Sequence, residues 1–404
     1  MFLRLAWRNV WRNRARAGIV FAAVAVGMAG VVLSMALNNG LVFQMVENAI
    51  ATEVGHLQVH ARGYSRNPGL ELRLRDGGEA AREVLRSLPE VRAWAPRVVA
   101  EGLLFSPRAS AGVRVFGVDP GREAGVSLVA RSIVAGRYLE GKHGEILVGE
   151  VLARRLRVGV GEKVVLSVQD AAGNFTGGAF RISGLFRSPA REFDRGTVFL
   201  DLGEARDLLG IGGDVSEIVV LVRRESWIPR VRRTLQERLG EGVEVRTWGE
   251  LRPLLLQMVE LFDQTAWYVY AAVFLAMVFG IANVLLVSVY ERLREFGILL
   301  SVGMRPRRLV AMIVTESLLL TLAGVAAGYG AAAWVVSAFH EGIDLGMWAE
   351  GLRAAGVGTR LVPFLRAYDF VVPLILAFAS ATGASLWPAW RAARLEPAEA
   401  LRSV

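Results

Sequence analysis

Four long runs of apolar residues set the pattern of this chain. Residues 18–46, 264–290 and 370–390 contain no charged side chain, and residues 309–339 contain one, Glu316. About 20 apolar helical residues cross the roughly 30 Å hydrocarbon layer of a bilayer, so we expect four transmembrane helices. The first run is longer than the apolar region of a signal peptide, which predicts an uncleaved anchor.

The segment between the first two runs, residues 47–263, has a different pattern. Alternating or β-branched stretches predict strands at 54–59, 113–118, 163–168, 179–186 and 218–222. Helical spacing of apolar residues predicts helices at 79–88, 202–209 and 228–239. We expect two subdomains, one combining 47–113 with 216–263 and one β-rich module between them. The predicted fold class is an integral membrane α-helical protein with a large mixed α+β domain inserted between transmembrane helices 1 and 2.

The net charge of +9 indicates how the spans are oriented. Residues 1–17, 291–308 and 391–404 together hold thirteen arginines and four glutamates, which accounts for the whole excess. Excess positive charge beside a span marks its cytoplasmic side, so both termini are predicted to be cytoplasmic. A basic chain also suggests nucleic acid as a partner. Because the excess is confined to the ends of spans, we expect no nucleic-acid binding.

The order of segments follows from the spans and their orientation. A cytoplasmic amphipathic N-terminal helix (1–17) precedes the first span (18–46), the extracytoplasmic, periplasmic domain (47–263) and the second span (264–290). A cytoplasmic loop (291–308), the third span (309–339), a short extracytoplasmic loop (340–369), the fourth span (370–390) and a cytoplasmic tail (391–404) follow.

Patterns typical of catalysis are weak in this chain. Residues 136–143 match the phosphate-binding pattern G-x-x-x-x-G-K up to Lys142, but His143 stands where a hydroxyl would hold magnesium. A turn is the better interpretation. His56 and His60 would lie about 13 Å apart in a strand, too far to share a metal ion. The chain has no cysteine, which excludes thiol catalysis. We expect no catalytic site, metal or cofactor on this chain.

Three motifs beside the spans carry a family resemblance. They are LAWRN at 5–9 with WRN at 11–13, ERLREFGILLSVGM at 291–304, and PAWRAARLEPAEALR at 388–402. In this order, with one span, a large outer domain and three further spans, the chain resembles FtsX-like ABC transporter permeases, which include the MacB and LolC/LolE types. GHLQVHARGY at 55–64 is similar to the opening strand of the lipoprotein-releasing LolC/LolE branch, which favours that branch.

The resemblance implies a pair of permeases, identical or different, served by two copies of a separate ATPase subunit that binds ATP and magnesium. In such a system the loop 291–308 docks on the ATPase as a coupling helix. The alternative is a loop whose arginines only set topology. The candidate ATPase-coupling residues are Glu291, Arg294, Glu295, Gly297, Ile298, Leu299, Gly303 and Met304.

Two further features concern charge and amphipathicity at the spans. Leu3, Trp7 and Val10 share one helical face and would hold the N-terminal segment at the membrane surface, as a passive anchor or with a mechanical role. Glu316 is an intramembrane carboxylate, a costly group that is usually paired or functional. Arg308 lies about 12 Å away along a helix. We expect an arginine of this cytoplasmic surface to be the partner of Glu316.

An amphipathic substrate would need apolar surfaces where spans one and two meet the second permease. Gly27 and Gly30 would permit close helix approach there, and methionines offer adaptable apolar contacts. The alternative is that these side chains only pack helices together. The candidate substrate-path residues are Met28, Met35, Met45, Leu255, Met258 and Phe262.

These features predict a permease subunit in a bacterial inner membrane. It would couple ATP hydrolysis on a partner chain to motion of its periplasmic domain, and extract or export lipoproteins or other amphipathic substrates, with or without a periplasmic carrier or adaptor. Two alternatives stay open. One is MacB-like efflux through a periplasmic adaptor and an outer-membrane duct, and the other is FtsX-like regulation of a cell-wall hydrolase without transport.

Overall fold

The computed structural model describes residues 14–346, 351, 358 and 360–394. The chain divides into two compact units, which we call the membrane unit (1–42, 259–344 and 360–404) and the outer domain (43–258 and 345–359). The helix predicted around Leu3, Trp7 and Val10 and the end of the predicted tail, 395–404, lie outside the described residues.

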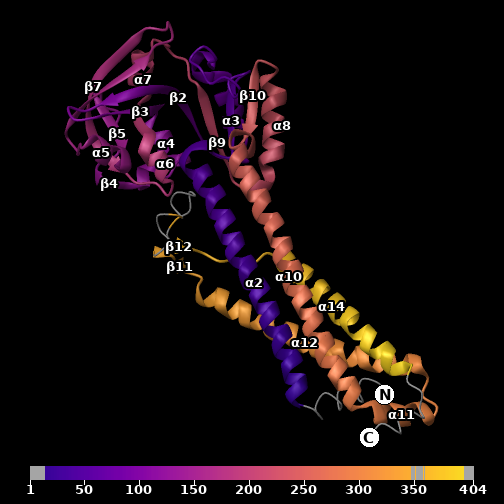
Figure 1. The fold of residues 1–404 in the computed structure, drawn as a ribbon. Helices are drawn as coiled ribbons and strands as arrows, with labels where there is room; N and C mark the ends of the chain where they lie inside the picture. Colours follow the sequence, from indigo (N-terminus) through magenta and orange to yellow (C-terminus); the bar gives the residue numbers. More distant parts are fainter. Residues whose placement is uncertain (1–13, 347–350, 352–357, 359, 395–404) are drawn as a thin grey trace. The chain divides into compact units, whose positions relative to one another are not determined.

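The membrane unit is built on four long helices: α2 (Arg14–Ala49), α10 (Pro253–Glu291), α12 (Pro306–Ala338) and α14 (Tyr368–Ala393) (Figure 1). All four are long and apolar enough to cross a membrane. A shorter helix, α11 (Leu293–Ser301), lies between α10 and α12 in the chain, and a two-residue ribbon pairs β11 (Ile343–Asp344) with β12 (Arg360–Leu361). At 1.5 Å per residue the 39 residues of α10 extend about 58 Å, so this helix exceeds the hydrocarbon layer.

Helix α12 approaches α2 closely through two of its glycines. A Cβ atom at Gly324 would lie 2.8 Å from the side chain of Val24, and one at Gly328 would lie 2.7 Å from the carbonyl oxygen of Ala25. The glycines expected to approach a second permease, Gly27 and Gly30, do not take part in this contact within the chain. Gly27 is at ordinary contact distance from Met277, and Gly30 faces open space, so the close packing depends on the small residues of α12.

The outer domain alternates strands and short helices. Its elements are η1 (Ile50–Val54), β1 (Leu57–Ala61), η2 (Arg75–Gly78), α3 (Glu79–Ser87), β2 (Val91–Phe105), β3 (Ser110–Val118), α4 (Pro120–Val126), η3 (Val129–Arg131), β4 (Ile133–Gly136), β5 (Glu145–Gly149), α5 (Glu150–Leu156), β6 (Lys163–Gln169), β7 (Phe175–Phe186), α6 (Arg191–Gly196), β8 (Thr197–Asp201), α7 (Leu202–Leu209), β9 (Glu217–Val222), η4 (Glu225–Trp227), α8 (Ile228–Leu239), β10 (Val243–Thr247) and α9 (Trp248–Leu251).

One sheet runs through the whole outer domain in the order β10-β1-β9-β2-β3-β8-β5-β7-β4, with β6 pairing β2 and β7. Its neighbours are antiparallel except β3 with β8 and β5 with β7. The long strand β2 pairs with β9 over its first half and with β6 over its end. The predicted combination of 47–113 with 216–263 is seen in the sheet, where β1, β9, β10 and the first half of β2 are neighbours. Strand β2 continues from them into the pairing with β3 and β6.

The predicted strand at 54–59 begins later than expected. Residues 50–54 form the π-helix η1, and the backbone N–H of Gly55 closes it by donating to the carbonyl of Ile50. Gly55 has φ +64°, a conformation that glycine adopts without strain. The other predicted strands and helices lie within observed elements or overlap most of them. Apolar residues of α3, α5, α7 and α8 pack with the strands in one core.

Candidate functional site

Helix α11 forms a short amphipathic element between two long helices of the membrane unit. It ends at Ser301. Just beyond, the N–H of Met304 donates to the carbonyl of Leu299 and the N–H of Gly303 donates to that of Leu300, both at 3.0 Å. These are the two bonds of a Schellman motif, which requires a left-handed residue, and Gly303 supplies it with φ +95°. The glycine therefore terminates the helix and reverses the chain toward α12.

One face of α11 belongs to a small apolar core. Phe296 is buried against Leu309 and Met312 of α12 and Ala389 of α14, and Leu299 and Met304 are partly buried at the edge of the same cluster. Gly297 is also buried. These contacts hold α11 against the ends of α12 and α14.

The opposite face of α11 is exposed and of mixed character. Arg294 and Glu295 are exposed, and the apolar side chains of Ile298 and Val302 are 47% and 82% exposed. Arg294, Ile298 and Val302 follow at steps of four, so they lie in one row along the helix. This face therefore combines exposed apolar and charged side chains.

Arg292 connects α11 with α12 at this end of the membrane unit. Its Nε atom lies 3.2 Å from Glu295 of α11, its Nη1 atom lies 3.3 Å from Glu316 of α12, and its guanidinium lies over the ring of Phe296 at 5.2 Å. The structure thus pairs Glu316 with an arginine of the predicted loop, and that arginine is Arg292. The expectation of a partner from this loop is confirmed. Spacing along one helix could not indicate which arginine it is, because the chain turns between α10 and α12.

The structure separates the eight predicted coupling residues into two groups. Glu291, Arg294, Glu295, Ile298 and Gly303 are exposed, whereas Gly297 is buried and Leu299 and Met304 are partly buried. The exposed residues are available to a partner. The others shape and hold the helix.

The predicted substrate-path residues also fall into two groups. Met28 and Met35 are buried in the apolar core of the membrane unit, and Met45 is buried too. Leu255 and Phe262 are half-buried and Met258 is exposed on α10. The placement of the three buried methionines favours packing over substrate contact.

The residues that resembled catalytic or metal sites have structural surroundings. Residues 137–144 lead from β4 into strand β5, where a nucleotide-binding loop would lead into a helix, and Lys142 bonds Glu140 at 2.7 Å on the surface. Burial lowers the pKa of His60 to about 4, so its ring is neutral, and it stacks on Tyr64 at 4.7 Å. His56 accepts a hydrogen bond from the N–H of Val222 at 3.2 Å.

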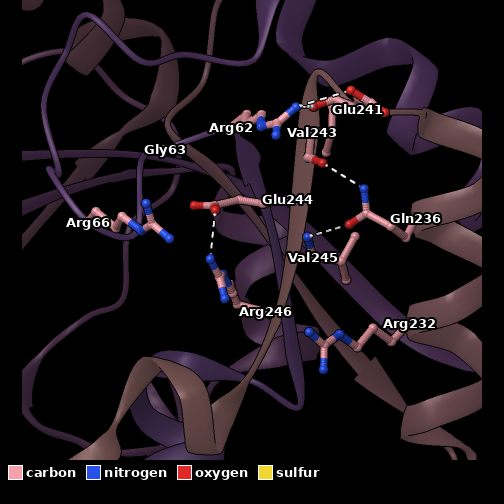
Figure 2. A pocket seen from close by; sticks show the side chains of 10 residues that line it. All are labelled: Arg62, Gly63, Arg66, Arg232, Gln236, Glu241, Val243, Glu244, Val245 and Arg246. Atoms are coloured by element: carbon pink, nitrogen blue, oxygen red, sulfur yellow. Dashed lines mark hydrogen bonds and ion pairs between the residues drawn. The ribbon is translucent and has the colours of Figure 1, made fainter.

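A pocket of about 530 Å³ opens on the outer domain beside α8 and β10 (Figure 2). Two of its arginines are paired with carboxylates of the pocket, Arg62 with Glu241 at 3.3 Å and Arg246 with Glu244 at 3.1 Å. The side chain of Gln236 donates to the carbonyl of Val243 and accepts from the N–H of Val245 (Figure 2). Gln236 thereby pairs with backbone groups at the edge of β10. Most of these polar groups satisfy one another, and we assign the pocket no ligand.

Comparison with known families accounts for both units. Residues 17–238 match the family described as MacB-like periplasmic core domain, and residues 267–397 match the family described as FtsX-like permease C-terminal. The chain is an FtsX-like permease with a MacB-like periplasmic core domain. The family resemblance in the sequence is thereby confirmed. This permease is a multi-pass membrane protein of the ABC transporter class, neither match is an ATPase domain, and an ABC permease implies a partner ATPase.

Relatives of this permease carry several names. The lipoprotein-releasing system transmembrane protein LolC of Xylella fastidiosa is 26% identical over 78% of each chain, and that of Neisseria meningitidis is 24% identical over 95% of this chain and 93% of its own. The macrolide export ATP-binding/permease protein MacB of Bdellovibrio bacteriovorus is 22% identical over 99% of this chain and 61% of its own. The solved periplasmic region of MacB from Actinobacillus actinomycetemcomitans covers 50% of this chain at 12% identity, with a TM-score of 0.35.

Proposed function

We propose that the exposed row of α11 is the docking surface for the partner ATPase and that α11 and both termini face the cytoplasm. The observation that carries the proposal is the combination of Ile298 and Val302, exposed and apolar, with Arg294 on the same face. Helix α11 would sit in a groove of the ATPase and would move with that groove when the nucleotide sites of the ATPase close. Phe296 and Arg292 would pass the displacement to α12 and α14, because both side chains contact α12 and Phe296 also packs with α14.

The same proposal includes a second permease, identical or different, beside α10. A continuous row of exposed residues recurs on this helix at steps of three and four: Leu254, Met258, Leu261, Thr265, Tyr268, Ala272, Leu275 and Phe279. This spacing is the seam of a coiled coil. Because α10 is longer than the hydrocarbon layer, lipid cannot cover the whole row. A second permease helix would cover the part that lies outside the bilayer.

For the substrate we propose lipoproteins or other amphipathic molecules, taken from the outer leaflet of a bacterial inner membrane. Similarity to LolC over most of both chains supports this choice. The exposed apolar residues Met258 and Leu261 support it as well. They lie in the row that would face the second permease, and a lipid-bearing substrate needs an apolar path between the two permeases. A periplasmic carrier or adaptor would receive the substrate.

Reconstitution of the permease with its ATPase in lipid nanodiscs tests this function. ATP should release a bound acylated protein, and the double variant Arg294→Ala with Ile298→Ala should lower both release and stimulation of the ATPase. The buried Gly297 is a poor probe, since its substitution would disturb packing. ATP-dependent transfer of a small efflux substrate to an adaptor, without release of acylated protein, would favour the MacB-like alternative. Activation of a cell-wall hydrolase without transport would favour the regulator.

A further inference from the structure

Six charged residues form a connected network inside the outer domain. Three are acidic, Glu53, Glu123 and Glu217, and three are arginines, Arg97, Arg114 and Arg252. They come from η1, α4, β9, β2, β3 and the residue that precedes α10. The network joins three carboxyl groups to three guanidinium groups, and its members lie far apart in the sequence.

Arg97 forms the buried half of the network. Its side chain is 1% exposed, and its Nε and Nη2 atoms donate to the two carboxylate oxygens of Glu123 at 2.9 and 2.6 Å. Its Nη1 atom lies 3.5 Å from Glu217 and donates to the backbone carbonyl of Glu53. Burying charges is costly unless they are paired in good geometry. Arg97 therefore holds the backbone of η1 against the centre of the sheet.

Glu53 forms the other half. One of its carboxylate oxygens pairs with Arg114 on β3 and the other pairs with Arg252. Glu53 lies in η1, which directly continues α2, and Arg252 directly precedes α10. A single carboxylate thus ties together the places where both long helices enter the outer domain, and joins them to a central strand.

The backbone around Glu53 is also fixed to the sheet. A Cβ atom at Gly55 would lie 2.4 Å from the side chain of Val219 on β9, and the N–H of Leu128 donates to the carbonyl of Ala51 at 2.7 Å. Ile50 is buried with Val219 in a separate apolar cluster. A displacement of η1 must therefore move β9 with it. Single π-helical turns are uncommon and are frequently found at functional sites.

We propose that Glu53 is a positioning residue for energy coupling: it clamps the outer-domain ends of α2 and α10 together, so that the helices and the sheet move as one body when the ATPase acts. This inference rests on the proposed function, because it assumes that movement begins at the partner ATPase. It assigns a role to a residue that touches neither ATP nor substrate.

The test uses the full permease with its ATPase in nanodiscs and the variants Glu53→Gln, Arg252→Gln, their double variant and Arg252→Lys. The chain has no cysteine, so cysteines introduced at Ala172 and Gln257 carry spin labels at defined sites, one on the β6–β7 turn and one on α10. In the wild type, the label distance should stay constant when nucleotide binds. In Glu53→Gln it should change, transport should fall about tenfold, and ATP hydrolysis should continue.

Further comparisons separate coupling from folding. The double variant should transport no more slowly than Glu53→Gln, because both changes break the same Glu53–Arg252 ion pair. Arg252→Lys keeps the positive charge and should transport faster than Arg252→Gln. Arg62→Gln, which breaks only the surface pair with Glu241, is the matched control and should behave as wild type.

The results also separate this inference from the proposed function. Wild-type transport and a constant label distance in Glu53→Gln would overturn the clamp, and so would a loss of transport fully explained by a lower thermal unfolding midpoint. If the wild type releases no acylated protein, the proposed substrate is wrong. The label distances still decide whether Glu53 holds the helices to the sheet.

Discussion

Removing the two apolar side chains from the exposed row of α11 should weaken ATPase binding by a calculable amount. Complete burial of a valine or isoleucine contributes about 1.5–3 kcal/mol. Ile298 is 47% exposed and Val302 is 82% exposed, so docking can still gain about 1 kcal/mol from the first and about 1.5 kcal/mol from the second. The double variant Ile298→Ser with Val302→Ser should therefore raise the Kd for the ATPase roughly 50-fold.

The assay is a direct binding titration of the purified ATPase against the permease in nanodiscs, at one salt concentration. A control is Leu103→Ser with Phe105→Ser, which changes two exposed apolar side chains, 48% and 38% exposed, on β2 of the outer domain. The control should leave the Kd unchanged. A change of less than about threefold in the α11 variant, or an equal change in the control, would refute the assignment of this surface.

Three further predictions address packing, charge and catalysis. Gly328→Ala should lower the free energy of unfolding of the solubilised chain by about 1–3 kcal/mol, because the added Cβ meets α2. Gly330→Ala on the same helix faces open space and should be tolerated. Equal effects of the two variants would contradict the contact between α12 and α2. Burial raises the pKa of Glu217 to about 7 from its ordinary 4.5, so its stabilising contribution, on the order of 3 kcal/mol, is complete below pH 4.5 and is lost as pH rises through 7. Glu217→Gln should flatten this dependence in denaturant titrations from about pH 5 to 8, and an unchanged slope would show that another group titrates. The chain alone should hydrolyse no ATP and Lys142→Ala should leave the rate of the complex unaltered; a loss of turnover in that variant would restore the nucleotide-binding interpretation.

The sequence alone predicted the four long helices, the mixed domain between the first two and the family. These features are readable because each depends on residues close together in the chain. A helix that crosses a bilayer must be apolar along its whole length, and an exposed face of a strand alternates with a buried one. The motif at 291–304 likewise indicated a helix with an exposed function, but eight candidate residues could not be sorted by pattern.

Only the tertiary structure decided which of these side chains are exposed and which hold the fold. Phe296 and Ile298 are both apolar and lie two positions apart, yet one is buried against α12 and α14 and the other is exposed. Glu53 meets arginines 61 and 199 positions away, a pairing that no local pattern encodes. A side chain's role here depends on neighbours brought together by the folded sheet and helices, and those neighbours are set by packing over long sequence distances.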